Sequence, residues 1–115
     1  MKNLGREGEE LATAFLRQKG YTILEQNYKT KFGEIDIIAK DSDVFVFVEV
    51  KTRADTTFGY PFEAVNLRKR DKIRKVALRF MKTQKKELPS RFDVMSITRD
   101  RGGTRIEHIQ DAFEV

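Results

Sequence analysis

Cysteine is absent from this chain, and histidine occurs once, at His108. Without cysteine the chain can form neither a disulfide nor a thiolate metal site, and a zinc site of the ordinary kind is not expected. We expect His108 to lie on the surface or at a cap rather than to bind a ligand. No apolar run is long enough for a signal peptide or a transmembrane helix, which indicates a cytoplasmic protein without a membrane partner.

Hydrophobic residues are also scarce, at 39% of the 115 residues, although nine phenylalanines can fill a core. A length of this order is typical of one domain, and we expect residues 1–115 to form it. Lysine and arginine number 23 against 18 acidic residues, which gives a formal net charge of +5. This modest excess fits a nucleic-acid partner, although many soluble proteins share it.

The most regular stretch runs from Gly33 to Arg53 and predicts two strands joined by a tight polar turn. After the turn, valine at every second position alternates with a second set of side chains, namely Phe45, Phe47, Glu49 and Lys51. Strict alternation predicts a strand with two different faces. Glu49 and Lys51 therefore end one face and point the same way.

The position of the turn decides whether Asp36 joins Glu49. With Asp41-Ser42 as a two-residue turn, Asp36 pairs with Phe47 and lies one diagonal step from Glu49. Diagonal neighbours across a strand pair lie roughly 7–8 Å apart, within reach of a shared ion. A slip of one residue would send Asp36 to the opposite face of the sheet.

The rest of the chain predicts helices over 3–19 and 67–84 and strands over 21–28, 92–98 and 105–109. In the first helix, Gly8 is a poor helix former, which predicts the close approach of another backbone or a ligand. Glu9 lies at the edge of the apolar arc, where a favourable acid in a first turn is the simplest interpretation.

The second helix carries most of its cations opposite its buried stripe, where they are either solvated or attractive to a nucleic-acid backbone. Lys69 is the exception, because it shares the arc of Ile73, Val76 and Phe80. A lysine there either snorkels out at the helix end or reaches into a site. The irregular segment 52–65 brings three more aromatic residues, which either stack on bases or cover the core: Phe58, Tyr60 and Phe62.

The charged residues of the central stretch suggest a chemistry. Asp36 is followed after twelve residues by Glu49-Val50-Lys51. Two carboxylates on neighbouring strands suit a hard cation such as Mg²⁺, which would activate water for hydrolysis of a phosphodiester. A lysine beside them would stabilise charge on the phosphate. The alternative is an exposed Glu–Lys pair, but these charges end an apolar strand, where unpaired burial would be costly.

Asp followed by Glu-x-Lys on adjacent strands resembles the core motif of the restriction-endonuclease-like superfamily. More closely, the chain resembles the YraN family of small bacterial endonuclease-like proteins, and the resemblance extends to archaeal Holliday-junction resolvases. The matching segments run in order through nearly the whole chain: Gly5-x-x-Gly8-Glu9-x-x-Ala12, Asn27, Gly33-Glu34-Ile35-Asp36, Phe47-Val48-Glu49-Val50-Lys51-Thr52-Arg53, Phe58-Gly59-x-Pro61 with Val65 and Lys69, and Arg91-Phe92-Asp93-Val94.

The resemblance implies an α/β fold, with a central mixed β-sheet flanked by α-helices, and hydrolysis of DNA phosphodiesters with Mg²⁺ or Mn²⁺. Asp36, Glu49 and the backbone carbonyl of Val50 would hold the metal. Lys51 would position the nucleophile or stabilise the phosphate. Glu9 would act through a second metal position or a water, which reverses the simpler interpretation of this residue.

The expected partner is DNA, with branched or recombining DNA as one candidate substrate and a homodimer as an open possibility. We expect phosphate contacts from Arg53, Lys69, Arg70 and Arg74. Two alternatives remain: a nucleic-acid-binding module of the same fold that does not cleave, and an interaction protein whose basic helix meets an acidic partner. The intact set of Asp36, Glu49 and Lys51 favours the enzyme.

Overall fold

The computed structural model describes residues 4–54 and 67–114. Within them the elements are α1 (Leu4–Gln18), β1 (Thr22–Thr30), β2 (Gly33–Asp41), β3 (Val44–Arg53), α2 (Leu67–Lys82), β4 (Ser90–Asp100) and β5 (Gly103–Ile109). This is the predicted order of helices and strands. The three aromatic residues of the 52–65 segment, Phe58, Tyr60 and Phe62, lie outside the described residues. No helix of the described part is long and apolar enough to cross a membrane.

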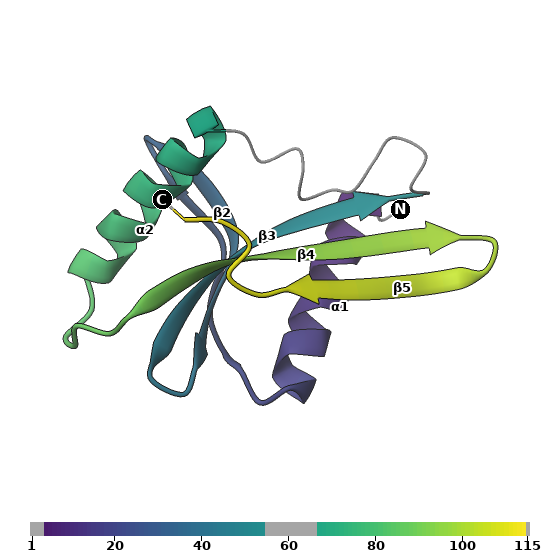
Figure 1. Cartoon of the computed structure of the whole chain (residues 1–115), viewed down its shortest axis with the longest axis horizontal. Helices are drawn as coiled ribbons and strands as arrows, with labels where there is room; N and C mark the ends of the chain where they lie inside the picture. Colours follow the sequence, from purple (N-terminus) through teal and green to yellow (C-terminus); the bar gives the residue numbers. More distant parts are fainter. Residues whose placement is uncertain (1–3, 55–66, 115) are drawn as a thin grey trace.

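The described strands form one mixed sheet in the order β1-β2-β3-β4-β5 (Figure 1). β3 and β4 are parallel, and the other neighbouring strands are antiparallel. A parallel pair needs a crossover connection, and α2 lies between β3 and β4 in the chain. The predicted α/β fold, a central mixed sheet flanked by helices, is confirmed.

The alternation in β3 divides the core between the two helices. Phe45 and Phe47 pack in a cluster with buried residues of α2, whereas Val46 and Val48 pack in a second cluster with buried residues of α1. Each helix therefore covers the side chains on one face of β3. The two-faced strand expected from the sequence is present, and burial of both faces holds the sheet between α1 and α2.

The turn between β2 and β3 lies one residue later than predicted. Asp41 pairs with Val44, so that Ser42 and Asp43 form the turn, with Ser42 at φ 52°. This register keeps Val44 in the ladder and places Asp43 in a turn, where aspartate is favoured. The change in pairing is two residues, so Ile38 takes the place opposite Phe47 that the predicted turn gave to Asp36.

The sheet forks at this point. The ladder between β2 and β3 ends at the Ile37–Val48 pair. On the far side of it, β2 continues to pair with β1 as far as Gly33, while β3 continues to pair with β4 as far as Arg53. In Figure 1 the two strands run toward different sides of the molecule. Side chains on both strands at the fork can therefore be approached by residues of other elements.

His108 corrects one prediction, because it is neither on the surface nor a cap. Its side chain is 3% exposed, and its Nε2 lies 2.7 Å from Oδ2 of the fully buried Asp93. Lys19 Nζ lies 2.9 Å from Nδ1. A lysine ammonium can only donate, so Nδ1 accepts and Nε2 carries the proton donated to Asp93. The polar partners that make this burial tolerable come from distant parts of the chain.

Candidate active site

Asp36 lies at the fork and is bonded to the opposite strand. Its Oδ2 accepts a hydrogen bond of 2.8 Å from the backbone N–H of Val50. The carboxylate thus satisfies a donor of β3 beyond the end of the ladder with β2. Because Val50 stands between Glu49 and Lys51, this one bond fixes Asp36 relative to the whole Glu-x-Lys segment.

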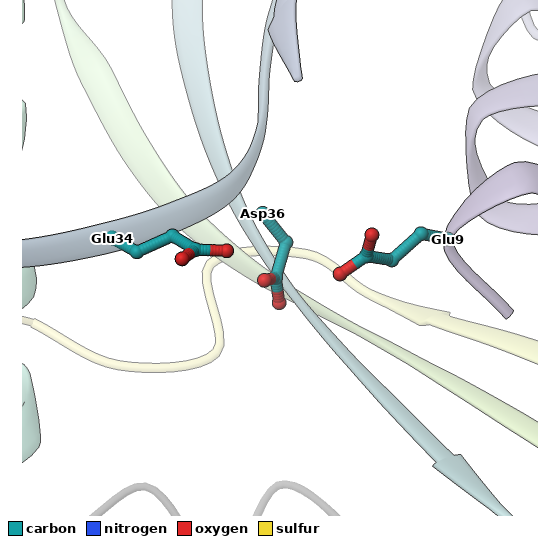
Figure 2. Close-up of side chains that lie close together, drawn as sticks. All are labelled: Glu9, Glu34 and Asp36. Atoms are coloured by element: carbon teal, nitrogen blue, oxygen red, sulfur yellow. The ribbon is translucent and has the colours of Figure 1, made fainter. Parts of the chain in front are cut away.

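Three carboxylates converge beside this bond. Glu9 of α1, Glu34 of β2 and Asp36 each place an oxygen within 4.8 Å of the others, and Figure 2 shows Asp36 between the other two. The side-chain amide of Asn27, oriented with its nitrogen toward the acids, lies 3.3 Å from Glu9 Oε2 and 3.1 Å from Glu34 Oε1. One donor therefore links two acids from different elements.

The crowding of acids changes the chemistry of Asp36. Burial raises the pKa of its carboxyl to about 7, and the charges of Glu49, Glu9 and Glu34 contribute in the same direction. The hydrogen bond from Val50 opposes them and does not outweigh them. A positive charge placed among these oxygens would remove the repulsion, so the arrangement favours a bound cation.

Glu9 reaches this site because α1 packs unusually close to β3. A Cβ atom built on Gly8 would lie 1.9 Å from Thr52 Oγ1, far inside any real contact. The expected close approach to Gly8 is present, but it is made by the side chain of Thr52 and not by a backbone or a ligand. Gly8 therefore sets the position of the neighbouring Glu9.

Glu49 is enclosed by two lysines. Its side chain is 10% exposed, and its Oε1 lies 3.2 Å from Lys51 Nζ and 2.5 Å from Lys69 Nζ. Lys69 of α2 thus reaches into the site, the second of the two roles considered for it. Burial lowers the pKa of the Lys51 ammonium, and Lys69 lowers it further. Burial would also lower the pKa of Lys69, but the hydrogen bond to Glu49 and the negative charge of that carboxylate outweigh the effect and raise it.

The other cations expected at DNA are spread over two elements. Arg53 ends β3. On α2, the Arg70 guanidinium lies 5.2 Å from the ring centroid of Phe113, and Arg74 forms an exposed ion pair of 2.9 Å with Asp71. Lys69, the fourth member of the predicted set, lies 2.5 Å from Glu49 Oε1.

Glu34 is the site residue that sequence reasoning did not single out. It stood in the quoted Gly33-Glu34-Ile35-Asp36 segment, and its signal was available there. Residues two apart on a strand share a face, so Glu34 and Asp36 follow the same rule that placed Glu49 with Lys51. Asn27, quoted only as part of the resemblance, likewise proves to contact Glu9 and Glu34.

In the described residues a five-stranded mixed sheet lies between two helices, and this α/β arrangement is consistent with the restriction-endonuclease-like fold. Residues 8–97 match the sequence model of the Uncharacterised protein family UPF0102, and the chain belongs to this family, which confirms its resemblance to YraN. A UPF0102 protein of Thermodesulfovibrio yellowstonii is 51% identical over 96% of this chain and 95% of its own length. One of Syntrophomonas wolfei is 47% identical over 97% and 98%.

Proposed function

We propose that this protein is a metal-dependent nuclease that hydrolyses DNA phosphodiesters at the fork between β2 and β3. The observation that carries the proposal is the bond between Asp36 and the Val50 N–H, which holds an aspartate beside a Glu-x-Lys segment. Restriction-endonuclease-like nucleases use these residue types in this order. Glu9 adds a further carboxylate from α1 to the same place.

The residues fit a divalent cation. The available donors are carboxylate and carbonyl oxygens, which are the ligands that Mg²⁺ and Mn²⁺ prefer. Asp36, Glu49 and the Val50 carbonyl would hold the ion, and Glu9 and Glu34 would bind it through water or hold a second one. A cation here would polarise the phosphate and activate a water molecule.

The lysines act on the substrate side of the reaction. In hydrolysis a water oxygen attacks phosphorus, the bond from phosphorus to the leaving ester oxygen breaks, and negative charge grows on the phosphate oxygens. Lys51 is repelled by the cation, so its role is to stabilise that growing charge or to orient the water. The distance of 3.2 Å between Lys51 Nζ and Glu49 Oε1 supports this role.

DNA binding would rest mainly on phosphate contacts. The chain has a net charge of +5, and Arg70 and Arg74 lie along α2, the helix that also brings Lys69 to the site. Phosphate contacts carry little sequence information and weaken steeply with salt. We therefore expect binding with little sequence preference and with a strong dependence on ionic strength.

The test is incubation of the purified protein with linear, single-stranded, flapped and four-way DNA, with Mg²⁺, with Mn²⁺ and with a chelator. The proposal predicts cleavage of at least one substrate with metal and none with chelator. Cleavage that survives chelation would contradict it. Binding that falls with salt, without cleavage under any metal, would instead identify a binding module of the same fold.

A further inference from the structure

The ammonium of Lys69 lies against Glu49, a carboxylate that would have to be accessible in order to bind a metal ion. Its ammonium lies 2.5 Å from Oε1 of Glu49, closer than Lys51 at 3.2 Å to the same oxygen. Only 10% of the Glu49 side chain is exposed, so water cannot replace a lost partner well. Among the described residues Lys69 is therefore the closest counter-ion of a nearly buried carboxylate.

Lys69 comes from a different layer of the molecule than its partner. Asp36, Glu49 and Lys51 belong to the central sheet, whereas Lys69 lies in the first turn of α2, near the start of the helix at Leu67. Its side chain is 35% exposed, against 23% for Lys51. Lys69 is thus the more exposed of the two lysine side chains that contact Glu49.

We propose that Lys69 is an internal counter-ion that competes with the divalent cation for Glu49 and is released when the cation binds. The inference rests on the proposed function, since it assumes that Glu49 is a metal ligand. Lys69 is thereby a positioning residue, because it acts through Glu49. On release its ammonium would become available to a DNA phosphate, so that metal loading and phosphate binding would favour each other.

The physical basis is that one carboxylate oxygen cannot serve two cations at full strength. A metal ion that binds Glu49 must displace the ammonium or share the oxygen with it, and both lower the affinity for the metal. Removing the Lys69 charge should therefore strengthen metal binding. Coupling between two separate binding sites typically amounts to about 5- to 150-fold in affinity, and we expect the effect of one neighbouring charge to fall at the low end of that range.

The test is calorimetric titration of Mn²⁺ into the whole protein and its variants at about 0.15 M salt, where exposed charges are screened. Lys69→Met should raise the affinity for Mn²⁺ by about 5- to 10-fold. Lys69→Gln keeps a hydrogen-bond donor for Glu49 without the charge, and it should raise the affinity for Mn²⁺ in the same way. This variant replaces Lys69→Met in the test if Lys69→Met folds poorly. Lys69→Arg keeps the charge and should retain the parent affinity.

Two controls separate the contact with Glu49 from a general effect of charge. Lys72→Met removes an exposed lysine three residues along the same helix and should leave the affinity within about twofold, because its charge is screened. In a Glu49→Gln background Lys69→Met should have no further effect, because the double-mutant cycle isolates the pair. Thermal unfolding in chelator should show Lys69→Met less stable than the parent, with the difference closing as Mn²⁺ is added.

The outcomes distinguish this inference from the proposed function. If Mn²⁺ binds and the Lys69 effects appear but no DNA is cleaved, the nuclease proposal fails and the role of Lys69 stands. If the parent cleaves DNA but Lys69→Met behaves like Lys72→Met, the role of Lys69 is refuted alone. A parent that binds no Mn²⁺ refutes the role of Lys69 together with the metal site.

Discussion

Asp36 bonds to the backbone of Val50, the residue that separates Glu49 from Lys51. A side chain of one strand thus replaces the backbone ladder at the point where β2 and β3 part. The bond holds the two arms of the fork together through a group that would also bind the metal. It further explains why a charged residue stands at the end of an otherwise apolar strand pair.

Asp36→Asn should separate metal binding from folding. The asparagine side-chain oxygen can still accept the Val50 N–H, while the repulsion with the neighbouring acids disappears. We expect the metal-free protein to gain about 1 kcal/mol of unfolding free energy, as when a strained active site is relieved, and to lose Mn²⁺ binding and cleavage. Urea unfolding and calorimetry measure the two effects.

The matched control is Asp43→Asn, which removes an exposed charge in the turn between β2 and β3. It should change neither stability nor metal affinity, because surface charges contribute little. If Asp36→Asn instead destabilises the protein and leaves Mn²⁺ binding intact, Asp36 is a structural residue and not a metal ligand.

Gly8→Ala should move Glu9. Alanine normally stabilises a helix relative to glycine by about 0.5–1 kcal/mol, but here its Cβ would lie 1.9 Å from Thr52 Oγ1. We expect a net loss of about 1–3 kcal/mol, the usual effect of overpacking, together with weaker Mn²⁺ binding. Thr52→Ala removes Oγ1, so the double variant should regain part of the lost stability and part of the lost Mn²⁺ affinity. A stabilising Gly8→Ala would show that α1 and β3 are not in close contact.

Lys51→Ala should keep the metal and lose the reaction. The lysine cannot bind a cation, so Mn²⁺ affinity should stay the same or rise. Cleavage should fall by about 10²–10³-fold, the usual effect of removing one preorganised charge stabiliser. Calorimetry and single-turnover cleavage on the same preparation check this. Cleavage at the parent rate would make Lys51 a mere surface partner of Glu49.

The buried Asp93 should govern stability at low pH. Burial alone would raise the pKa of this carboxyl, but hydrogen bonds from His108, Arg91 and the Asp111 backbone outweigh it and lower the pKa below its ordinary 3.8. The ionised form therefore stabilises the fold above pH 3.8, and this contribution is lost as pH falls through the lowered pKa. Urea unfolding of the parent between pH 7 and pH 2 should show that loss.

Asp93→Asn should remove this dependence. At pH 7 the free energy of unfolding of the variant should be lower than that of the parent by about 3 kcal/mol or more, because His108 and Arg91 then lack a buried anionic partner. The difference in unfolding free energy between variant and parent should become smaller as pH falls, because the Asp93 carboxylate of the parent becomes protonated. A gap that is constant with pH would show that the charge of Asp93 does not stabilise the fold.

The order of the elements and the two faces of β3 were predictable because both follow from periodicity. Alternation of Val and Phe in β3 repeats with period two, so a shift of the pairing by two residues left both faces of β3 unchanged. The turn itself was not predictable, because Asp41, Ser42 and Asp43 are all favoured in turns. The sequence offered no local signal to choose among them.

The contacts between distant elements could not be derived from the sequence in this way. Lys69 meets Glu49 only because α2 packs on the face of β3 that ends in Glu49, whereas the helical wheel slightly favoured snorkelling. His108 was misplaced because its partner Asp93 is 15 residues away on the neighbouring strand. Register between β4 and β5 brings them together, and a single sequence does not specify register at that range.

The metal centre at the fork is tested most directly by anomalous diffraction from crystals soaked in Mn²⁺. We predict a manganese peak in contact with carboxylate oxygens of Asp36 and Glu49 and with the Val50 carbonyl, and no such peak in Asp36→Asn crystals. A peak held by Glu9 and Glu34 without Asp36 or Glu49, or no peak at a concentration that saturates binding in solution, would contradict the assignment.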